Sequence, residues 1–273
     1  MSLRREGKFK RRYKYSFGSF VAFMAVGAAL YYIQHLLIFR PSKLKKDFKF
    51  EFRHNFEEVF LKSSEKSSLN ALYFKSENPK GVILYFHGNA GDLSRWGHIS
   101  EYFVDLDYNV FVIDYRTYGK SKGKLSEQAL YDDAQFSYDY LLKTYSEDQI
   151  IIYGRSLGTG IATYLASNNT PKRLLLETPY YSLVDVAQFR FPLFPVRRML
   201  KYKIPTFQYI ENVRCPIDII HGTLDIVVPL SSGKKLYENA PKDSSSMTIV
   251  KGGGHNNLVT FEAYQNWINE VLD

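Results

Sequence analysis

Short apolar runs, rich in branched and aromatic residues, recur at intervals along most of the chain. Six of them are Val82–Phe86, Asn109–Tyr115, Ile150–Tyr153, Arg173–Leu176, Ile217–His221 and Met247–Val250. Two strand-like stretches, Glu58–Lys62 and Leu69–Lys75, precede them, and helical patterns such as Ser126–Tyr145 and Phe261–Leu272 lie between or after them. Runs this continuously apolar are typical of strands buried on both faces of a parallel sheet. The alternation therefore predicts an α/β fold with a mostly parallel, doubly wound central sheet and helices on both faces.

The segment Tyr15–Phe39 contains 25 residues without Asp, Glu, Lys or Arg. Crossing a bilayer core takes roughly 20 helical residues, so we expect a single transmembrane anchor. A cleaved signal peptide requires small residues after the apolar core, and this run ends in LLIFRP. A helix buried in a folded domain is the other alternative. The resulting division is a basic tail (1–14), the anchor (15–39), a basic stalk (40–55) and one domain (56–273).

The net charge of +8 is concentrated before residue 50. The first 49 residues carry 12 Lys and Arg against 2 acidic residues, and the other 224 carry 24 against 26. A nucleic-acid-binding domain is expected to carry its basic patch on the folded body, so nucleic acid is not an expected partner, whereas a membrane is. The basic flank before the anchor is the stronger, which favours an N-terminus on the inside.

Few cysteines and the absence of recognisable ligand motifs limit the cofactors that the chain is expected to use. Cys215 is the only cysteine, which excludes an intrachain disulfide framework and a Cys-rich zinc site. We find no metal-ligand set and no nucleotide-binding loop in the sequence, and we therefore expect no cofactor. The oligomeric state has no signature in the sequence.

The pentapeptide Gly154-Arg155-Ser156-Leu157-Gly158 directly follows the apolar run Ile150–Tyr153. This is the pattern G-x-S-x-G in a strand–turn–helix setting, where the glycines permit a sharp turn that leaves the serine side chain exposed. An ordinary glycine-rich turn is the alternative, and the preceding strand argues against it. Ser156 is the candidate nucleophile.

A serine hydroxyl needs a base, and the base needs an orienting carboxylate. In this kind of site the chain order is serine, then acid, then histidine. Only His221 and His255 follow Ser156; His221 ends a strand and suits a structural role, whereas His255 lies in the flexible sequence GGGHNN. Asp225 follows a strand and is the expected acid, with Glu177 and Asp114 as rivals.

The sequence FHGNAG follows the run Val82–Phe86. An oxyanion hole needs two main-chain donors aimed at the developing charge. We expect the amides of Leu157, which follows the candidate nucleophile, and of Asn89, in this loop. His87 is expected to make structural hydrogen bonds.

These motifs, with DYRTYGKSKG, LETPYYSL and HGTLDIVVP, closely resemble the alpha/beta-hydrolase superfamily over most of residues 56–273. They are most similar to a branch of membrane-anchored serine hydrolases that includes fungal bud-emergence homologues and mammalian relatives, some of which remove palmitoyl groups from proteins. The resemblance implies an alpha/beta-hydrolase fold with Ser156 as nucleophile, His255 as base and Asp225 as orienting acid. The chain departs from the family at Thr117, where a glycine is usual.

The segment at about 178–212 is long for a connection and contains FRFPLFPVRRMLKYKIPTF. Connections of this length are often lids or binding elements, and aromatic and basic residues together suit a membrane surface. We expect this insert (178–212) to be a lid-like element over the serine, with a plain connecting excursion as the alternative.

Together these features predict a single-pass, membrane-anchored serine hydrolase that cleaves an acyl ester or thioester, lipid-linked substrates included, through an acyl-enzyme. A serine peptidase or aminopeptidase with the same triad is the alternative within enzymes. The contrasting alternative is a catalytically silent, membrane-anchored binding module.

Overall fold

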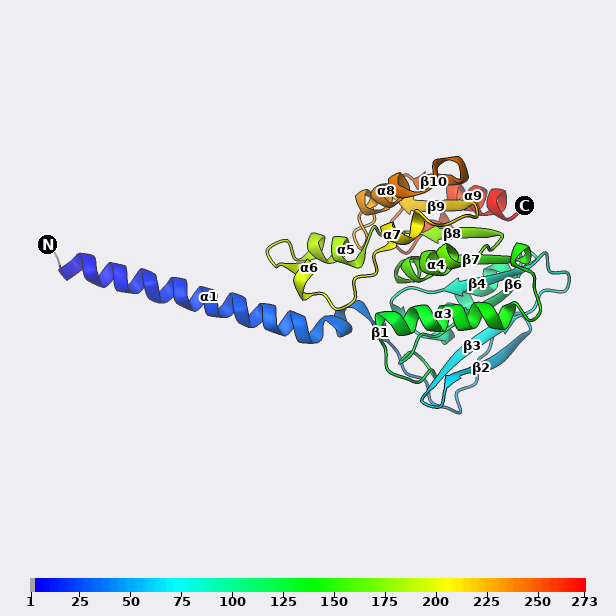
Figure 1. Ribbon diagram of the computed structural model, residues 1–273, viewed down its shortest axis with the longest axis horizontal. Helices are drawn as coiled ribbons and strands as arrows, with labels where there is room; N and C mark the ends of the chain where they lie inside the picture. Colours follow the sequence, from blue (N-terminus) through cyan, green and yellow to red (C-terminus); the bar gives the residue numbers. More distant parts are fainter. Residues whose placement is uncertain (1–2) are drawn as a thin grey trace.

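The computed structural model describes the backbone of residues 3–273 and the side-chain surroundings of residues 18–62 and 65–273. A mixed eight-stranded sheet forms the centre of the body, in the order β10-β9-β8-β7-β4-β6-β3-β2 (Figure 1). Its strands are β2 (Phe56–Ser64), β3 (Ser67–Phe74), β4 (Val82–Phe86), β6 (Asn109–Ile113), β7 (Ile150–Arg155), β8 (Arg173–Glu177), β9 (Ile217–Gly222) and β10 (Ser245–Val250). All eight strand-like stretches of the sequence are therefore strands of one sheet.

The six strands from β10 to β6 run parallel, and β3 and β2 add an antiparallel edge. In parallel strands the carboxyl ends lie at one edge of the sheet, where loops gather into a ligand site. β4 lies between β7 and β6, so the chain adds β6 on one side of β4 and then β7, β8, β9 and β10 on the other. The predicted α/β class with a mostly parallel sheet is confirmed.

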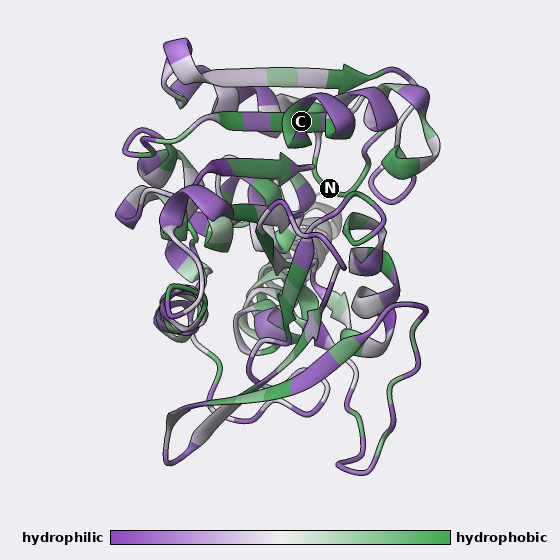
Figure 2. Cartoon of the chain, turned by 90° about the vertical axis from the view of Figure 1, so that its right-hand side faces the viewer, coloured by the Kyte–Doolittle hydropathy of each residue, from purple (hydrophilic) through white to green (hydrophobic). Residues whose placement is uncertain are grey.

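Alternate residues of the central strands enter two different hydrophobic cores. In β4, Leu84 and Phe86 belong to one core, and Ile83 and Tyr85 belong to the other; all four are fully buried. This explains why the strands read as continuous apolar runs rather than as alternating ones. Figure 2 shows hydrophobic stretches along the central strands and hydrophilic stretches along the surrounding helices.

Helices cover both faces of the sheet (Figure 1). The first core receives residues from α3, α4, α7 and α8, and the second receives residues from α2 and α9. The helices are α1 (Leu3–Ile38), α2 (Leu93–Ser100), α3 (Glu127–Leu141), α4 (Leu157–Asn168), α5 (Leu183–Arg190), α6 (Val196–Met199), α7 (Thr206–Ile210), α8 (Leu230–Asn239) and α9 (Glu262–Leu272). The insert contains α5, α6 and α7.

The long helix α1 projects from the body (Figure 1). Its stretch Gly18–Ile38 is long and apolar enough to cross a membrane, and hardly any of it is buried. A helix of the hydrophobic core would be mostly covered by protein, so this alternative does not fit the arrangement. The side chains of the basic tail, from Arg4 to Lys14, and of Tyr15 lie outside the described residues.

Residues 40–55 run along the body. β1 (Arg40–Pro41) pairs in parallel with β5 (Ala90–Gly91), the strand that follows the HGN sequence. Further on, Phe50 and Phe52 pack against the second core. The segment expected to be a stalk therefore fixes the end of α1 against the loop that contains Asn89.

Candidate active site

Ser156 lies at a sharp turn between β7 and α4. Its backbone has φ 51° and ψ −116°, outside the conformations that side-chain-bearing residues usually adopt. The main-chain N–H of Ser156 donates to the carbonyl of Glu177 at 2.9 Å, and Thr159 N–H donates to the Ser156 carbonyl at 3.0 Å. The strained serine is thus held by a strand on one side and by a helix on the other.

The neighbouring glycines leave no room for a side chain. A Cβ at Gly158 would lie 2.0 Å from the Phe86 carbonyl oxygen, and one at Gly154 would lie 2.7 Å from the Ala162 Cβ. A Cβ at Gly160 would lie 2.4 Å from the Tyr180 hydroxyl. The pattern G-x-S-x-G-x-G therefore follows from close packing of α4 against β4 and the insert.

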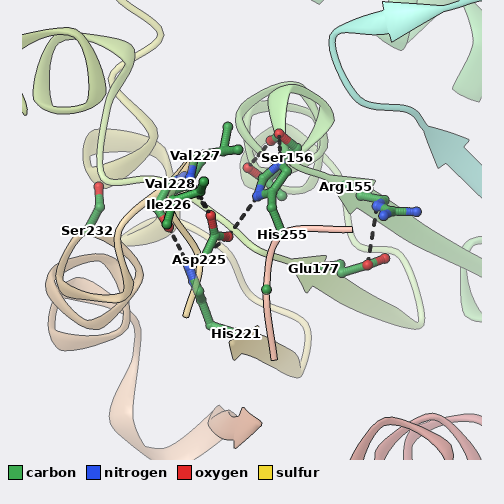
Figure 3. Close-up of polar contacts among 12 residues, drawn as sticks. Arg155, Ser156, Glu177, His221, Asp225, Ile226, Val227, Val228, Ser232 and His255 are labelled. Carbon is green, nitrogen blue, oxygen red and sulfur yellow. Dashed lines mark hydrogen bonds and ion pairs between the residues drawn. The ribbon is translucent and has the colours of Figure 1, made fainter. Parts of the chain in front are cut away.

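Three side chains that are far apart in the sequence form a continuous hydrogen-bonded row (Figure 3). His255 Nε2 lies 2.8 Å from Ser156 Oγ, and His255 Nδ1 lies 2.7 Å from Asp225 Oδ2. With the proton on Nδ1, the imidazole donates to the carboxylate and accepts from the serine hydroxyl. The structure brings Ser156, Asp225 and His255 together.

Asp225 is buried but well supplied with donors. The amides of Val227 and Val228 both donate to Oδ1 at 2.8 Å. Burial opposes ionisation, but the hydrogen bonds from His221, from His255 and from the Val228 amide outweigh it and hold the pKa of Asp225 well below its usual range. The group therefore faces His255 as a carboxylate.

His221 takes the structural role that the sequence suggests. Its ring is fully buried at the end of β9, where Nε2 donates to the Val228 carbonyl at 3.0 Å and lies 3.4 Å from Asp225 Oδ2. Gly233 makes this possible, since a Cβ there would lie 2.4 Å from His221 Nδ1. His221 thus holds the loop of Asp225.

The two rival carboxylates have other partners. Glu177 Oε1 pairs with Arg155 Nε at 3.2 Å (Figure 3). Its Oε2 accepts from the Tyr153 hydroxyl at 2.7 Å. Asp114 Oδ1 lies 3.2 Å from His87 Nε2 in a fully buried pair, and burial raises the pKa of Asp114. Neither carboxylate is recorded beside His255.

The loop of residues 87–91 has all five carbonyl oxygens occupied. The donors to them are, in chain order, Tyr115 OH, His87 Nδ1, Arg40 N with Tyr118 OH, Trp96 Nε1 and Ser42 N. The loop passes close to the nucleophile, because a Cβ at Gly88 would lie 3.7 Å from Ser156 Cβ. These hydrogen bonds hold the backbone of the loop in place next to Ser156.

The two residues expected to supply the oxyanion donors, Leu157 and Asn89, line the same cavity as Ser156. Leu157 is the first residue of α4, so its N–H has no partner within the helix. The Asn89 carbonyl and side chain are both occupied, the side-chain Nδ2 donating to the Ile38 carbonyl at 3.1 Å. For the Asn89 N–H, no acceptor occurs among the described residues.

A cavity of about 510 Å³ lies over this row. Ser156, Leu157, Asn89 and His255 all line it, together with apolar residues of the insert. Its charged lining residues are Arg40, Arg95, Arg155 and Arg190, and no acidic residue is among the lining residues that the structure describes. The cavity therefore suits an apolar group next to a neutral or anionic one.

Several residues of the site were not foreseen from the sequence. Arg155 and Glu177 form a nearly buried ion pair beside the nucleophile. Leu37 and Ile38 from the end of the anchor, and Arg40 just after it, line the cavity. Arg155, which precedes the serine within G-x-S-x-G, was a possible signal for the ion pair. The anchor residues have no local signal, since their contacts join parts of the chain more than 50 residues apart.

Within residues that the structure describes, no group of three His, Cys, Asp or Glu side chains is suited to hold a metal ion.

The fold and the serine turn define a hydrolase of the α/β class, and comparisons with known proteins agree. The family model described as serine aminopeptidase, S33 matches residues 77–212. The alpha/beta hydrolase domain-containing protein 17C of Xenopus tropicalis is 33% identical, over 79% of this chain and 69% of its own length. A protein of Acanthamoeba polyphaga mimivirus, described as an alpha/beta hydrolase, is 29% identical over 86% of this chain and 91% of its own length.

The esterase Pf2001 of Pyrococcus furiosus has a similar structure, with a TM-score of 0.68 at 17% identity, over 86% of this chain and 96% of its own. The chain belongs to the alpha/beta-hydrolase family, as the sequence motifs predict.

Proposed function

We propose that the protein is a membrane-anchored serine hydrolase that cleaves an acyl ester or thioester. The observation that carries the proposal is the hydrogen-bonded row Ser156–His255–Asp225 at the floor of a largely apolar cavity. Three side chains from three loops need not adopt this order and these distances for a purely structural purpose. This argues against a catalytically silent binding module.

The proposed reaction begins when Ser156 Oγ attacks the acyl carbonyl carbon and His255 Nε2 takes the hydroxyl proton. Asp225 keeps the proton on Nδ1 and stabilises the imidazolium that forms. The amides of Leu157 and Asn89 stabilise the oxyanion. His255 returns its proton to the leaving alcohol or thiol, and water then attacks the acyl-enzyme by the same route.

An aminopeptidase is the second candidate, since the matching family model has that description. An enzyme of that kind needs a group that binds the ammonium of a peptide N-terminus. The cavity has arginines and no acidic residue among its described lining residues, and an arginine repels an ammonium group. The composition of the cavity therefore favours an ester or thioester.

For the location we propose a single-pass anchor formed by α1, with the N-terminus inside. The apolar stretch Gly18–Ile38 supports the anchor, and the stronger basic flank before it favours the N-terminus on the inside. A membrane location places the cavity, whose wall includes the end of α1, within reach of lipid-linked acyl groups.

A fluorophosphonate probe tests the proposal directly. The full-length protein is expected to react, and Ser156→Ala is expected to lose both the labelling and ester turnover, the latter on the order of 10⁴-fold or more. A panel of acyl esters, acyl thioesters and aminoacyl amides then separates the two enzyme candidates. Preferred cleavage of the amides, or equal labelling of Ser156→Ala, would sink the proposal.

A further inference from the structure

A second cavity lies beside α1, next to the cavity over Ser156. The second cavity has a volume of about 80 Å³, and its walls are almost entirely apolar. Five residues line both cavities: Leu37, Ile38, Ala187, Phe191 and Leu200. The two cavities are therefore adjacent, and we refer to them together as the passage between the anchor helix and the insert.

One face of α1 rests against the insert. Phe23 stacks on Phe194 with ring centroids 4.6 Å apart, and a Cβ at Gly27 would lie 3.4 Å from the Phe194 ring. Further along, Gln34 is hydrogen-bonded to the backbone of residues 199 and 201. Spacings of four and seven residues place these positions on the same side of a helix. The wall that α1 contributes is thus fixed in place.

The second cavity lies at the end of the candidate membrane span. Its residues from α1 are Leu30, Tyr31, Gln34, Leu37 and Ile38, and the span ends at Ile38. Lys201 Nζ lies 4.3 Å from the centre of the Tyr31 ring, and tyrosine with a basic residue is typical of the layer where hydrocarbon meets headgroups. The passage therefore leads from Ser156 toward the surface layer of the bilayer.

We infer that this passage is the acyl-chain site and that the anchor helix forms one of its walls. The inference rests on the proposed function and goes beyond it in one point: the chain of a long acyl substrate lies between α1 and the α5–α6 segment, with the carbonyl over Ser156. The apolar walls of the second cavity and the lining residues that it shares with the first supply the argument, because a methylene chain needs apolar surroundings close to the carbonyl. The anchor is then part of the specificity of the site as well as its tether.

The test narrows the passage from the side of α1. Full-length protein in lipid nanodiscs is assayed with 4-nitrophenyl butyrate and 4-nitrophenyl decanoate. Each methylene that enters an apolar site from water improves binding roughly fourfold, so the ratio of kcat/KM for decanoate to that for butyrate reports the passage. In Leu37→Trp we expect this ratio to fall about 15-fold, since loss of the outer part of the site removes the contribution of about two methylenes.

Leu36→Trp is the matched control. Leu36 is the neighbouring residue, is exposed and lines neither cavity, so this variant is expected to keep the wild-type ratio. Ala187→Trp narrows the same passage from the insert, with exposed Gln188→Trp as its control. Equal ratios in Leu37→Trp, Ala187→Trp and the wild type would overturn the acyl-chain site.

A covalent probe gives a second measurement that does not depend on a substituted side chain. A long-chain alkyl fluorophosphonate with a diazirine at the end of its chain reacts with Ser156 and is then photolysed. Cross-links to residues 30–38 or 194–200 are expected, and cross-links confined to other parts of the chain would contradict the inference. Failure of the proposed function has a different signature, since the wild type would then show neither labelling of Ser156 nor ester turnover.

Discussion

Gln34 Oε1 accepts a 2.6 Å hydrogen bond from the main-chain N–H of Lys201. Its Nε2 donates to the Met199 carbonyl at 3.2 Å, and the side chain is 6% exposed. Burial of a glutamine side chain costs free energy unless both its amide oxygen and its amide nitrogen have hydrogen-bond partners. Here the amide joins the end of the anchor to the insert, so the polar residue that interrupts the apolar run is a structural connection between them.

Gln34→Leu is therefore expected to loosen the insert. The change leaves the Lys201 N–H and the Met199 carbonyl without this partner, at a cost of about 1–3 kcal/mol. The insert is then detached from α1 for a larger fraction of the time. Trypsin cleavage at Arg197 and Arg198 in nanodiscs is therefore expected to be at least about fivefold faster. Both arginines are exposed.

His35→Leu is the control for that prediction. The ring of His35 is exposed, and its recorded hydrogen bond is to Tyr32 within the same helix. Cleavage of this variant is expected at the wild-type rate. Equal cleavage rates in both variants and in the wild type would show that Gln34 does not hold the insert.

Asp225→Asn tests the role of the orienting carboxylate. An amide favours the wrong tautomer of His255 and cannot stabilise an imidazolium, so kcat for a short ester is expected to fall on the order of 10⁴-fold while the fold remains. Asp218→Asn is the control: Asp218 is on β9 but pairs with Arg173, away from the cavity. Turnover by Asp218→Asn is expected to stay near that of the wild type, and a similar loss in both variants would contradict a specific role for Asp225.

The pH dependence of stability is a separate consequence of the same carboxylate. The pKa of Asp225 is lowered in the folded protein, so the folded state binds its proton less readily than the unfolded state, whose aspartates titrate near about 3.9. The stabilisation is fully present above that pH and is lost as the pH falls through the folded-state pKa.

Melting temperatures of the wild type and of Asp225→Asn measure this effect. We expect the wild type to melt higher at pH 7 and the difference to shrink below about pH 4, where the unfolded-state carboxylate becomes protonated. A difference that stays constant from neutral to acidic pH would mean that Asp225 does not contribute through its ionised form.

The parts of the molecule that could be predicted are those with local signals. Val82–Phe86 is the same five residues in sequence and structure, because a strand buried on both faces is marked by each of its residues. Ser156 is marked by Gly154 and Gly158, two residues to either side, where close neighbouring atoms leave no room for a Cβ. For His255 and Asp225, the chain order and their positions after strands left few choices, and the rivals Glu177 and Asp114 are explained by their own buried partners.

Contacts across long sequence distances could not be predicted. The pairing of residues 40–41 with 90–91 and the hydrogen bonds of Gln34 join segments about 50 and 165 residues apart. Nothing in the sequence LLIFRP indicates that it ends beside the serine. Composition shows that the segment is apolar, whereas only the folded chain shows what its apolar side chains face.

Thr117 offers a last test, since it occupies a position where members of the branch that this chain resembles usually have glycine. Its φ is 79°, a value that a β-branched residue rarely adopts. Relief of that strain stabilises the folded state by about 1–2 kcal/mol. The greater freedom of glycine in the unfolded chain opposes this by about 0.5–1 kcal/mol. Thr117→Gly is therefore expected to raise the melting temperature by about 2 °C.

Gly119→Ala, two residues on, is the opposing control. The φ of Gly119 is 47°, and a Cβ there would lie 2.0 Å from Asp114 Oδ2, so this variant is expected to melt at a lower temperature. If Thr117→Gly also melts lower than the wild type, the threonine side chain stabilises the turn more than its backbone conformation costs.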